Sequence, residues 1–125
     1  GHIMLLEKQT GRLFSGDQLT EHNIWYFMSA DEQAPFALAI HSMDKLLARD
    51  SEITTVLSAH GKVPIDLSYA RDLRECLAEE LPRTYRQDQP FHSFMGDGWQ
   101  HFYKTVNLIY SDARLGEYLG HPVQR

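Results

Sequence analysis

Apolar positions in the first third of the chain predict two short strands followed by a long loop. Residues 3–8 form an apolar run that predicts a buried strand, and residues 9–12 predict a turn in which Gly11 takes a positive φ. Residues 13–15 predict a second strand. The mixed, aromatic stretch 18–35 predicts an ordered loop, and long ordered loops are often functional.

The clearest periodic signal lies in residues 36–49, where apolar side chains recur at the three- and four-residue spacing of one helix face. Residues 53–57 are apolar and β-branched, and they predict a buried strand. A second helix is predicted from residue 67 to about residue 81, with Asp66 as its N-cap and Pro82 as its stop.

The last part of the chain predicts a C-terminal hairpin. Its strands are residues 91–95 and 99–110, and its turn is Gly-Asp-Gly at 96–98. The order strand, strand, helix, strand, helix, hairpin is typical of the α/β class, with a mixed sheet and two main helices. The whole of 1–125 is predicted to be a single domain.

Composition excludes several classes of protein. The formal net charge of −5 argues against binding to a nucleic-acid backbone, which needs clustered Lys and Arg. No apolar run approaches the ~20 residues that span a bilayer, and no signal-peptide pattern is visible, so we expect a cytoplasmic protein without membrane contact. Cys76 is the only cysteine, which excludes an internal disulfide, and its place on the second helix predicts a small buried residue.

Two potential metal ligands each follow a predicted strand. Asp17 comes after Gly16, and His60 comes before Gly61. A glycine at a strand end permits a tight turn, so that the neighbouring side chain projects from the carboxyl edge of the sheet, where ligands gather in α/β proteins. A carboxylate beside an imidazole suits Zn, Mn or Fe. On this pattern alone, a structural role for both residues is the simpler interpretation.

A wider pattern adds to this pair. Residues 10–19, Thr-Gly-Arg-Leu-Phe-Ser-Gly-Asp-Gln-Leu, resemble the stretch of the metallo-β-lactamase superfamily in which a strand delivers an aspartate that bridges two metals. Residues 42–47 and 55–65 resemble the later helix of that family and the strand after it, which ends in His-Gly and a proline-containing loop. The resemblance covers residues 3 to about 81.

The resemblance implies the C-terminal half of an αββα sandwich. It also implies that Asp17 bridges two metals, that His60 binds the second metal, and that a metal-activated water hydrolyses an ester, thioester or lactone-type small molecule. The family's His-x-His-x-Asp-His motif does not occur in the 125 residues. A catalytic zinc normally has three protein ligands. We therefore expect this chain alone to be inactive and to bind zinc, or another divalent metal, weakly or not at all.

The first residues have two interpretations. Gly1-His2-Ile3 resembles the end of the family's His-Thr-Pro-Gly-His-Ile segment, in which case Gly1 is native and His2 is structural. Alternatively, residues 1–3 are a cloning scar ahead of an initiating Met4. Both interpretations remain open.

Other candidates have simpler roles. His22 follows Asp17 in the predicted loop, where solvation is the preferred role over facing the site. His41 is expected at the border of the first helix face, and strand pairing accounts for His92 and His101. The aromatic run 25–27 suits a pocket wall, the core or a subunit interface equally.

Half of a sandwich would expose one apolar sheet face, and monomers seldom leave such a face open. We therefore expect a homodimer. Two other functions compete with the hydrolase fragment. One is a non-enzymatic α/β half-domain that dimerises, and the other is an unrelated α/β binding module in which Asp17 and His60 are structural and far apart.

Overall fold

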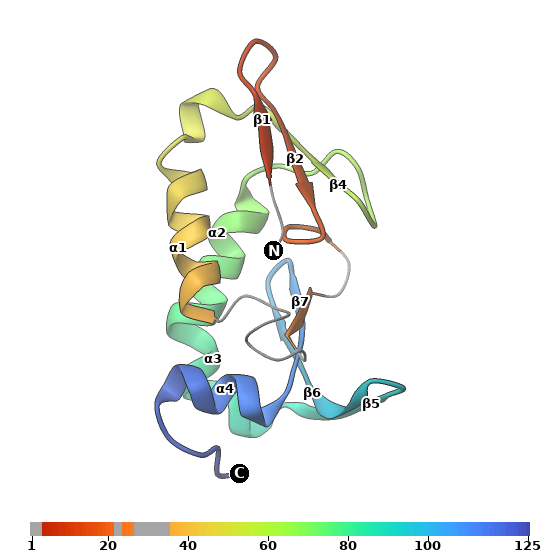
Figure 1. The fold of residues 1–125 in the computed structure, drawn as a ribbon, viewed down its shortest axis with the longest axis vertical. Helices are drawn as coiled ribbons and strands as arrows, with labels where there is room; N and C mark the ends of the chain where they lie inside the picture. The colour runs from red at the N-terminus through yellow and green to blue at the C-terminus, as the bar shows by residue number, and fades with distance from the viewer. Residues whose placement is uncertain (1–3, 22–23, 27–35) are drawn as a thin grey trace.

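The computed structural model describes residues 4–21, 24–26 and 36–125 and confirms the α/β class (Figure 1). The strands are β1 (Leu5–Glu7), β2 (Arg12–Gly16), β3 (Ile24–Tyr26), β4 (Thr55–Ser58), β5 (Gln89–Ser93), β6 (Gly96–Tyr103) and β7 (Val106–Tyr110). The helices are α1 (Phe36–Leu47), α2 (Ser68–Glu75), α3 (Leu81–Thr84) and α4 (Asp112–Leu119), with short 3-10 turns η1 (Asp50–Glu52) and η3 (Tyr85–Gln87) and a π-helical turn η2 (Cys76–Glu80).

The strands divide between two sheets, and both sheets are mixed as predicted. The first has the order β1-β2-β4, with β1 antiparallel and β4 parallel to β2. The second has the order β3-β7-β6-β5, in which only β3 and β7 run parallel. Each parallel pair joins segments far apart in the sequence, since a parallel connection needs a long crossover.

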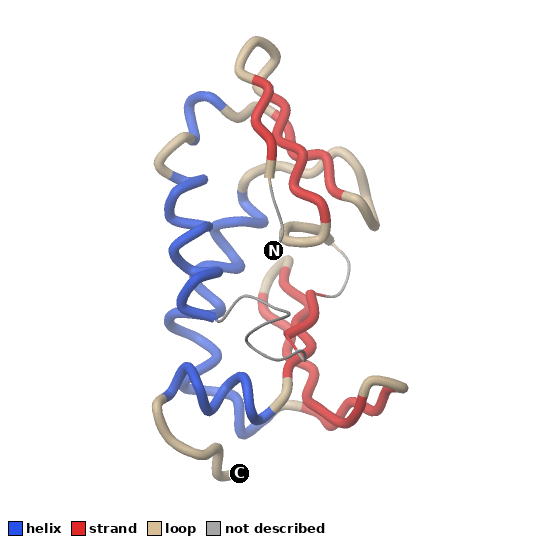
Figure 2. Tube along the Cα trace, viewed as in Figure 1, coloured by secondary structure: helices blue, strands red, loops and turns tan. Residues whose placement is uncertain are grey.

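The helices form a layer along one side of both sheets (Figure 2). Side chains alternate along β2, so Leu13 and Ser15 are buried while Arg12 and Phe14 face outward. A single apolar cluster joins the inward strand faces to the helices. Its largest fully buried members are Tyr110, Phe36, Leu13, Leu19, Met43, Leu73, Leu77, Leu81, Leu108, Leu115 and Val56. Within the described part of the chain, no helix combines the length and apolarity needed to cross a membrane.

The second helix extends beyond its predicted end. α2 widens into the π turn η2 at Cys76 and continues as α3 to Thr84, so the prediction that Pro82 stops the helix is wrong. Pro82 stands in the first turn of α3, directly after the π turn, a position at which the missing N–H of proline is tolerated. The N-cap position is Leu67 rather than the predicted Asp66, but Asp66 Oδ1 still accepts from the Ser68 N–H at 2.8 Å at the start of the helix.

The C-terminal hairpin is confirmed, but its turns lie elsewhere. The β5–β6 turn is at residues 94–95 rather than at 96–98, with Ser93 paired to Gly96. The predicted strand 99–110 is broken by a turn at residues 104–105, which separates β6 from β7.

Two elements were not predicted. β3 lies inside the stretch interpreted as a loop, so that interpretation is wrong for residues 24–26. α4 follows β7 and is capped by Ser111, whose Oγ accepts from the Arg114 N–H at 3.2 Å. Its end at Gly120, where φ is 79°, is a common helix terminus.

Candidate functional site

Asp17 and His60 meet where two neighbouring strands end. β2 and β4 are parallel, Gly16 is in register with Ser58, and the Ala59 N–H continues the ladder by donating to Gly16 O at 3.0 Å. The Nε2 atom of His60 lies 2.9 Å from the Oδ1 atom of Asp17. The predicted proximity of the two side chains is therefore confirmed, whereas their role as metal ligands stays a prediction.

Hydrogen bonds between the two loops hold the His60 backbone. The hydroxyls of Thr20 and Ser58 both donate to His60 O, at 2.6 and 2.9 Å respectively. The Lys62 N–H donates to Glu21 Oε1 at 2.8 Å, which is a further hydrogen bond between the same two loops. The imidazole therefore projects from a backbone that is fixed relative to the β2 end.

Both side chains are open to solvent. Asp17 is 55% exposed and His60 is 64% exposed, so an ion or a small molecule can reach the space between them. Among residues 4–21, 24–26 and 36–125, no third side chain of ligand type completes a group with this pair. His2 and His22 lie outside the described residues. The arrangement thus offers one carboxylate and one imidazole, one fewer than a catalytic zinc normally takes from protein.

The remaining histidine predictions have different outcomes. His41 is exposed on α1, in keeping with a surface role. His92 is also exposed and contacts its strand partner Asp97, with Nδ1 2.7 Å from Oδ1, so strand pairing accounts for it. For His101 that explanation is insufficient, because its ring is buried and contacts two carboxylates.

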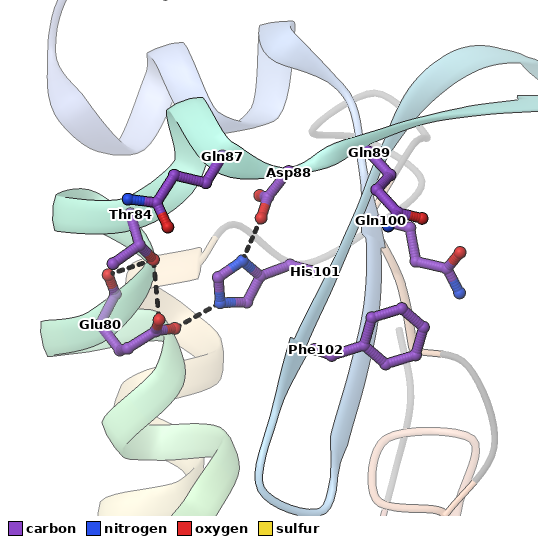
Figure 3. Close-up of a pocket in the computed structure, with 8 residues that line it drawn as sticks. All are labelled: Glu80, Thr84, Gln87, Asp88, Gln89, Gln100, His101 and Phe102. Carbon is purple, nitrogen blue, oxygen red and sulfur yellow. Dashed lines mark hydrogen bonds and ion pairs between the residues drawn. The ribbon is translucent and has the colours of Figure 1, made fainter.

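His101 lies at the centre of a polar cluster in the second sheet (Figure 3). Its Nδ1 atom is 2.5 Å from Asp88 Oδ1, and its Nε2 atom is hydrogen-bonded to Glu80 Oε2. Cys76 is completely buried, as predicted, and belongs to the same cluster. The sequence pattern did not predict this grouping. The available signal was a histidine at an inward position of a strand, between Trp99 and Tyr103.

Burial and hydrogen bonding shift the pKa values of His101 and Cys76 in opposite directions. Burial lowers the pKa of His101, but hydrogen bonds with Asp88, Cys76 and Glu80 outweigh it and raise that pKa to about 10. Burial raises the pKa of the Cys76 thiol, and the contact with His101 partly offsets this rise. The pKa of Tyr110 is raised by burial and by its hydrogen bond with Asp88.

Each carboxylate in the cluster has a further partner on its other oxygen. The Thr84 hydroxyl donates to Glu80 Oε1 at 2.7 Å. The Tyr110 hydroxyl donates to Asp88 Oδ2 at 2.5 Å and accepts from Arg125 Nη2 at 3.2 Å. Both carboxylates are consequently fixed in orientation, with one oxygen of each directed at the His101 ring.

The aromatic run has a partly structural role. Tyr26 is buried and packs edge-on against Phe36, with ring centroids 4.9 Å apart, so it is a core residue. Trp25 packs edge-on against Phe91 at 5.3 Å. Phe27 lies outside the described residues.

Comparison with known proteins adds no relative to this picture. No family model, no curated protein and no solved structure matches the chain. The superfamily resemblance therefore remains an interpretation of the sequence between residue 3 and about residue 81.

Proposed function

We propose that this chain is the part of a metal-dependent hydrolase that supplies Asp17 and His60 as metal ligands. The observation that carries the proposal is the 2.9 Å approach of these side chains at the carboxyl ends of two adjacent parallel strands. The hydroxyl contacts from Thr20 and Ser58 add support, because a ligand needs a fixed backbone.

The chemistry follows from the donor set. A zinc or other divalent ion at this position would supply an activated water for attack on an ester, thioester or lactone carbonyl. Asp17 offers carboxylate oxygens, and His60 offers the lone pair of Nε2 once the hydrogen bond to Asp17 is given up. Because both side chains are exposed, water and a small substrate have access to the same edge of the sheet.

With only two ligands at this position, the chain alone lacks a complete catalytic zinc site. Three protein ligands are usual for a catalytic zinc, so the proposal includes further ligands from residues outside these 125. We therefore expect the Asp17 and His60 pair of the 125-residue chain to bind zinc weakly, and the chain to show no hydrolysis at this pair.

Zinc titration of the purified chain, followed by the NMR signals of the histidine rings, tests the ligand pair. We expect the His60 ring signals to shift as zinc is added, and Asp17→Ala to weaken this response about tenfold or more. The exposed pair His92 and Asp97, 2.7 Å apart in the β5–β6 hairpin, is a matched control. Equal responses of His60 and His92, or an unchanged response in Asp17→Ala, would contradict the proposal.

Activity requires a longer polypeptide that contains the chain. We expect such a protein to hydrolyse a thioester or lactone in a metal-dependent manner, and Asp17→Ala to abolish this activity while the protein stays folded. Metal-dependent hydrolysis that survives Asp17→Ala would place the reaction elsewhere.

One observation favours the dimerising half-domain as a second candidate. Leu5, Phe14 and Leu57 are register partners across β1, β2 and β4, so they lie in one row on the outer face of the first sheet. Leu5 is 64% exposed and Phe14 is 42% exposed. A second copy of the chain would cover this apolar row, and the oligomeric state in solution tests the idea.

A further inference from the structure

We propose that Cys76, Glu80 and His101 form a separate metal site for zinc or a chemically similar ion. Their ligand atoms, one sulfur, one carboxylate oxygen and one ring nitrogen, all lie within 4.8 Å of one another. Within the described ranges, no other group of three or more ligand-type side chains is this compact. The site shares no residue with Asp17 and His60, so the two proposals stand or fall separately.

Helix and sheet bring the three ligands together. Cys76 and Glu80 begin and end the π turn η2, and their four-residue spacing puts both on the same side of the helix. His101 comes from β6, which faces this turn (Figure 3). Single π turns within α-helices occur frequently at functional sites. The π turn that precedes Pro82 therefore also contains two of the three proposed ligands.

The separations suit a tetrahedral ion after a small adjustment. Metal–ligand distances of about 2.0–2.3 Å place tetrahedral donor atoms about 3.3–3.8 Å apart. The sulfur, oxygen and nitrogen atoms of the cluster now lie within 4.8 Å of one another, so small movements bring them to that spacing. Glu80 and His101 are now hydrogen-bonded, so their side chains have to separate by about 1 Å, and the proton between them and the Cys76 thiol proton have to leave to solvent as the metal binds. The Glu80 side chain is 20% exposed, and a small rotation about its Oε1 contact with Thr84 provides that movement.

The surroundings resemble the outer shell of a zinc site. A histidine that binds a metal through one nitrogen usually donates its other N–H to a carboxylate. Asp88 Oδ1 occupies that position, 2.5 Å from His101 Nδ1, which leaves Nε2 directed at Glu80. Asp88 is itself held by Tyr110, and Glu80 is held by Thr84. Both ligands are thus oriented by a second layer of hydrogen bonds.

An open pocket gives access to the cluster. Its volume is about 230 Å³, and Glu80, Asp88 and His101 contribute to its wall. Cys76 is not part of the wall, and it is completely buried in the protein interior. Three protein ligands with one open side match a zinc that keeps water or a small ligand in its fourth position.

A purely structural network is the competing explanation. His101 bonded to Asp88 and Glu80 would pair buried charges without any metal. In that explanation the Cys76 sulfur is only a buried hydrogen-bonding neighbour of His101. Coordination through the Cys76 sulfur is therefore the property that separates the two explanations.

Cobalt(II), which adopts the tetrahedral geometry of zinc and absorbs light, provides the test. Metal-free wild-type chain is titrated with Co²⁺ and then with Zn²⁺. We expect sulfur-to-cobalt charge-transfer absorption in the near ultraviolet that saturates at a single equivalent and is removed by zinc. Absence of this absorption in the folded wild-type chain would overturn the proposal, and this result requires no variant to fold.

Variants then assign the site. Cys76→Ser should abolish the charge-transfer absorption, and His101→Gln should weaken cobalt binding at least about tenfold. Asp17→Ala is the matched control and should leave the absorption unchanged, whatever the outcome for the first site. Circular dichroism confirms that each variant is folded. Charge-transfer absorption that persists in folded His101→Gln with unchanged affinity would also overturn the site.

Discussion

The guanidinium group of Arg125 lies over the indole ring of Trp99, 3.7 Å from the ring centroid. The same side chain donates from Nη1 to Tyr85 O at 2.7 Å and from Nη2 to Asp112 Oδ1 at 2.8 Å. Arg125 therefore contacts β6 through stacking, and η3 and the first turn of α4 through hydrogen bonds. Through Tyr110 it also reaches the hydrogen bonds that orient Asp88.

Replacement of Arg125 should destabilise the fold. We expect Arg125→Ala to lower the free energy of unfolding by about 1–3 kcal/mol, because a stacked cation and the hydrogen bonds to Tyr85, Asp112 and Tyr110 are lost together. Urea denaturation measures the change. Arg86→Ala is the control, since Arg86 is exposed and stacks on Tyr85 at 4.6 Å, and it should change stability by less than about 0.5 kcal/mol. Equal effects of the two substitutions would show that the tail is not anchored in this way.

Asp66, at the start of α2, should make stability depend on pH in the acid range. The side-chain and backbone hydrogen bonds from Ser68 lower the pKa of Asp66. A lowered folded-state pKa means that the contribution of the carboxylate is present above its unfolded pKa and is lost as the pH falls through the folded pKa. Asp66→Ala should therefore cost about 1 kcal/mol at neutral pH and less below about pH 4.

Unfolding in urea at neutral and acid pH measures this dependence. Asp66→Asn keeps an oxygen that accepts at the start of the helix but removes the titration, so its stability should fall less than that of the wild type on acidification. An Asp66→Ala deficit that stays the same at both pH values would contradict a role for the carboxylate charge.

A side chain at position 11 should destabilise the fold for two separable reasons. Its φ is 72°, and a Cβ there would lie 2.8 Å from Thr54 Oγ1. Gly120 has a similar φ of 79° but open space around the corresponding Cβ position. We expect Gly120→Ala to cost about 1–2 kcal/mol from the backbone alone, and Gly11→Ala to cost about 1–3 kcal/mol more from the clash. Thermal unfolding of both variants measures the difference, and equal losses would contradict the close packing of Gly11 against Thr54.

The sequence predicted those elements whose signal is local. The apolar stripe of α1 and the β-branched run of β4 are each visible within one segment. β3 is only three residues long and is defined by pairing with β7, more than eighty positions away, so its own residues carry too little pattern. Pro82 was misinterpreted because a π turn, invisible in the spacing, placed it at the start of a new helical segment.

The same distinction applies to the two sites. Asp17 and His60 each follow a strand, and the parallel pairing of β2 with β4 was enough to bring them together. The cluster around His101 draws on the π turn, the segment after η3 and β6. No spacing along the chain relates these segments, and the folded arrangement of helix against sheet creates the cluster.

The outer face of the first sheet should mediate self-association. Phe14 is the middle residue of the row Leu5, Phe14 and Leu57, so a charge there would have to be buried in any dimer that uses this face. We expect light scattering at micromolar concentration to show a dimer for the wild type and a monomer for Phe14→Glu. Phe102→Glu, on the second sheet at 62% exposure, is the control and should remain dimeric. A monomeric wild type, or a dimer lost only in Phe102→Glu, would show that the row is not the contact surface. Because Phe14 lies on the opposite face of β2 from buried Leu13, its substitution should leave the core intact, and an unchanged circular dichroism spectrum would confirm that only association was altered.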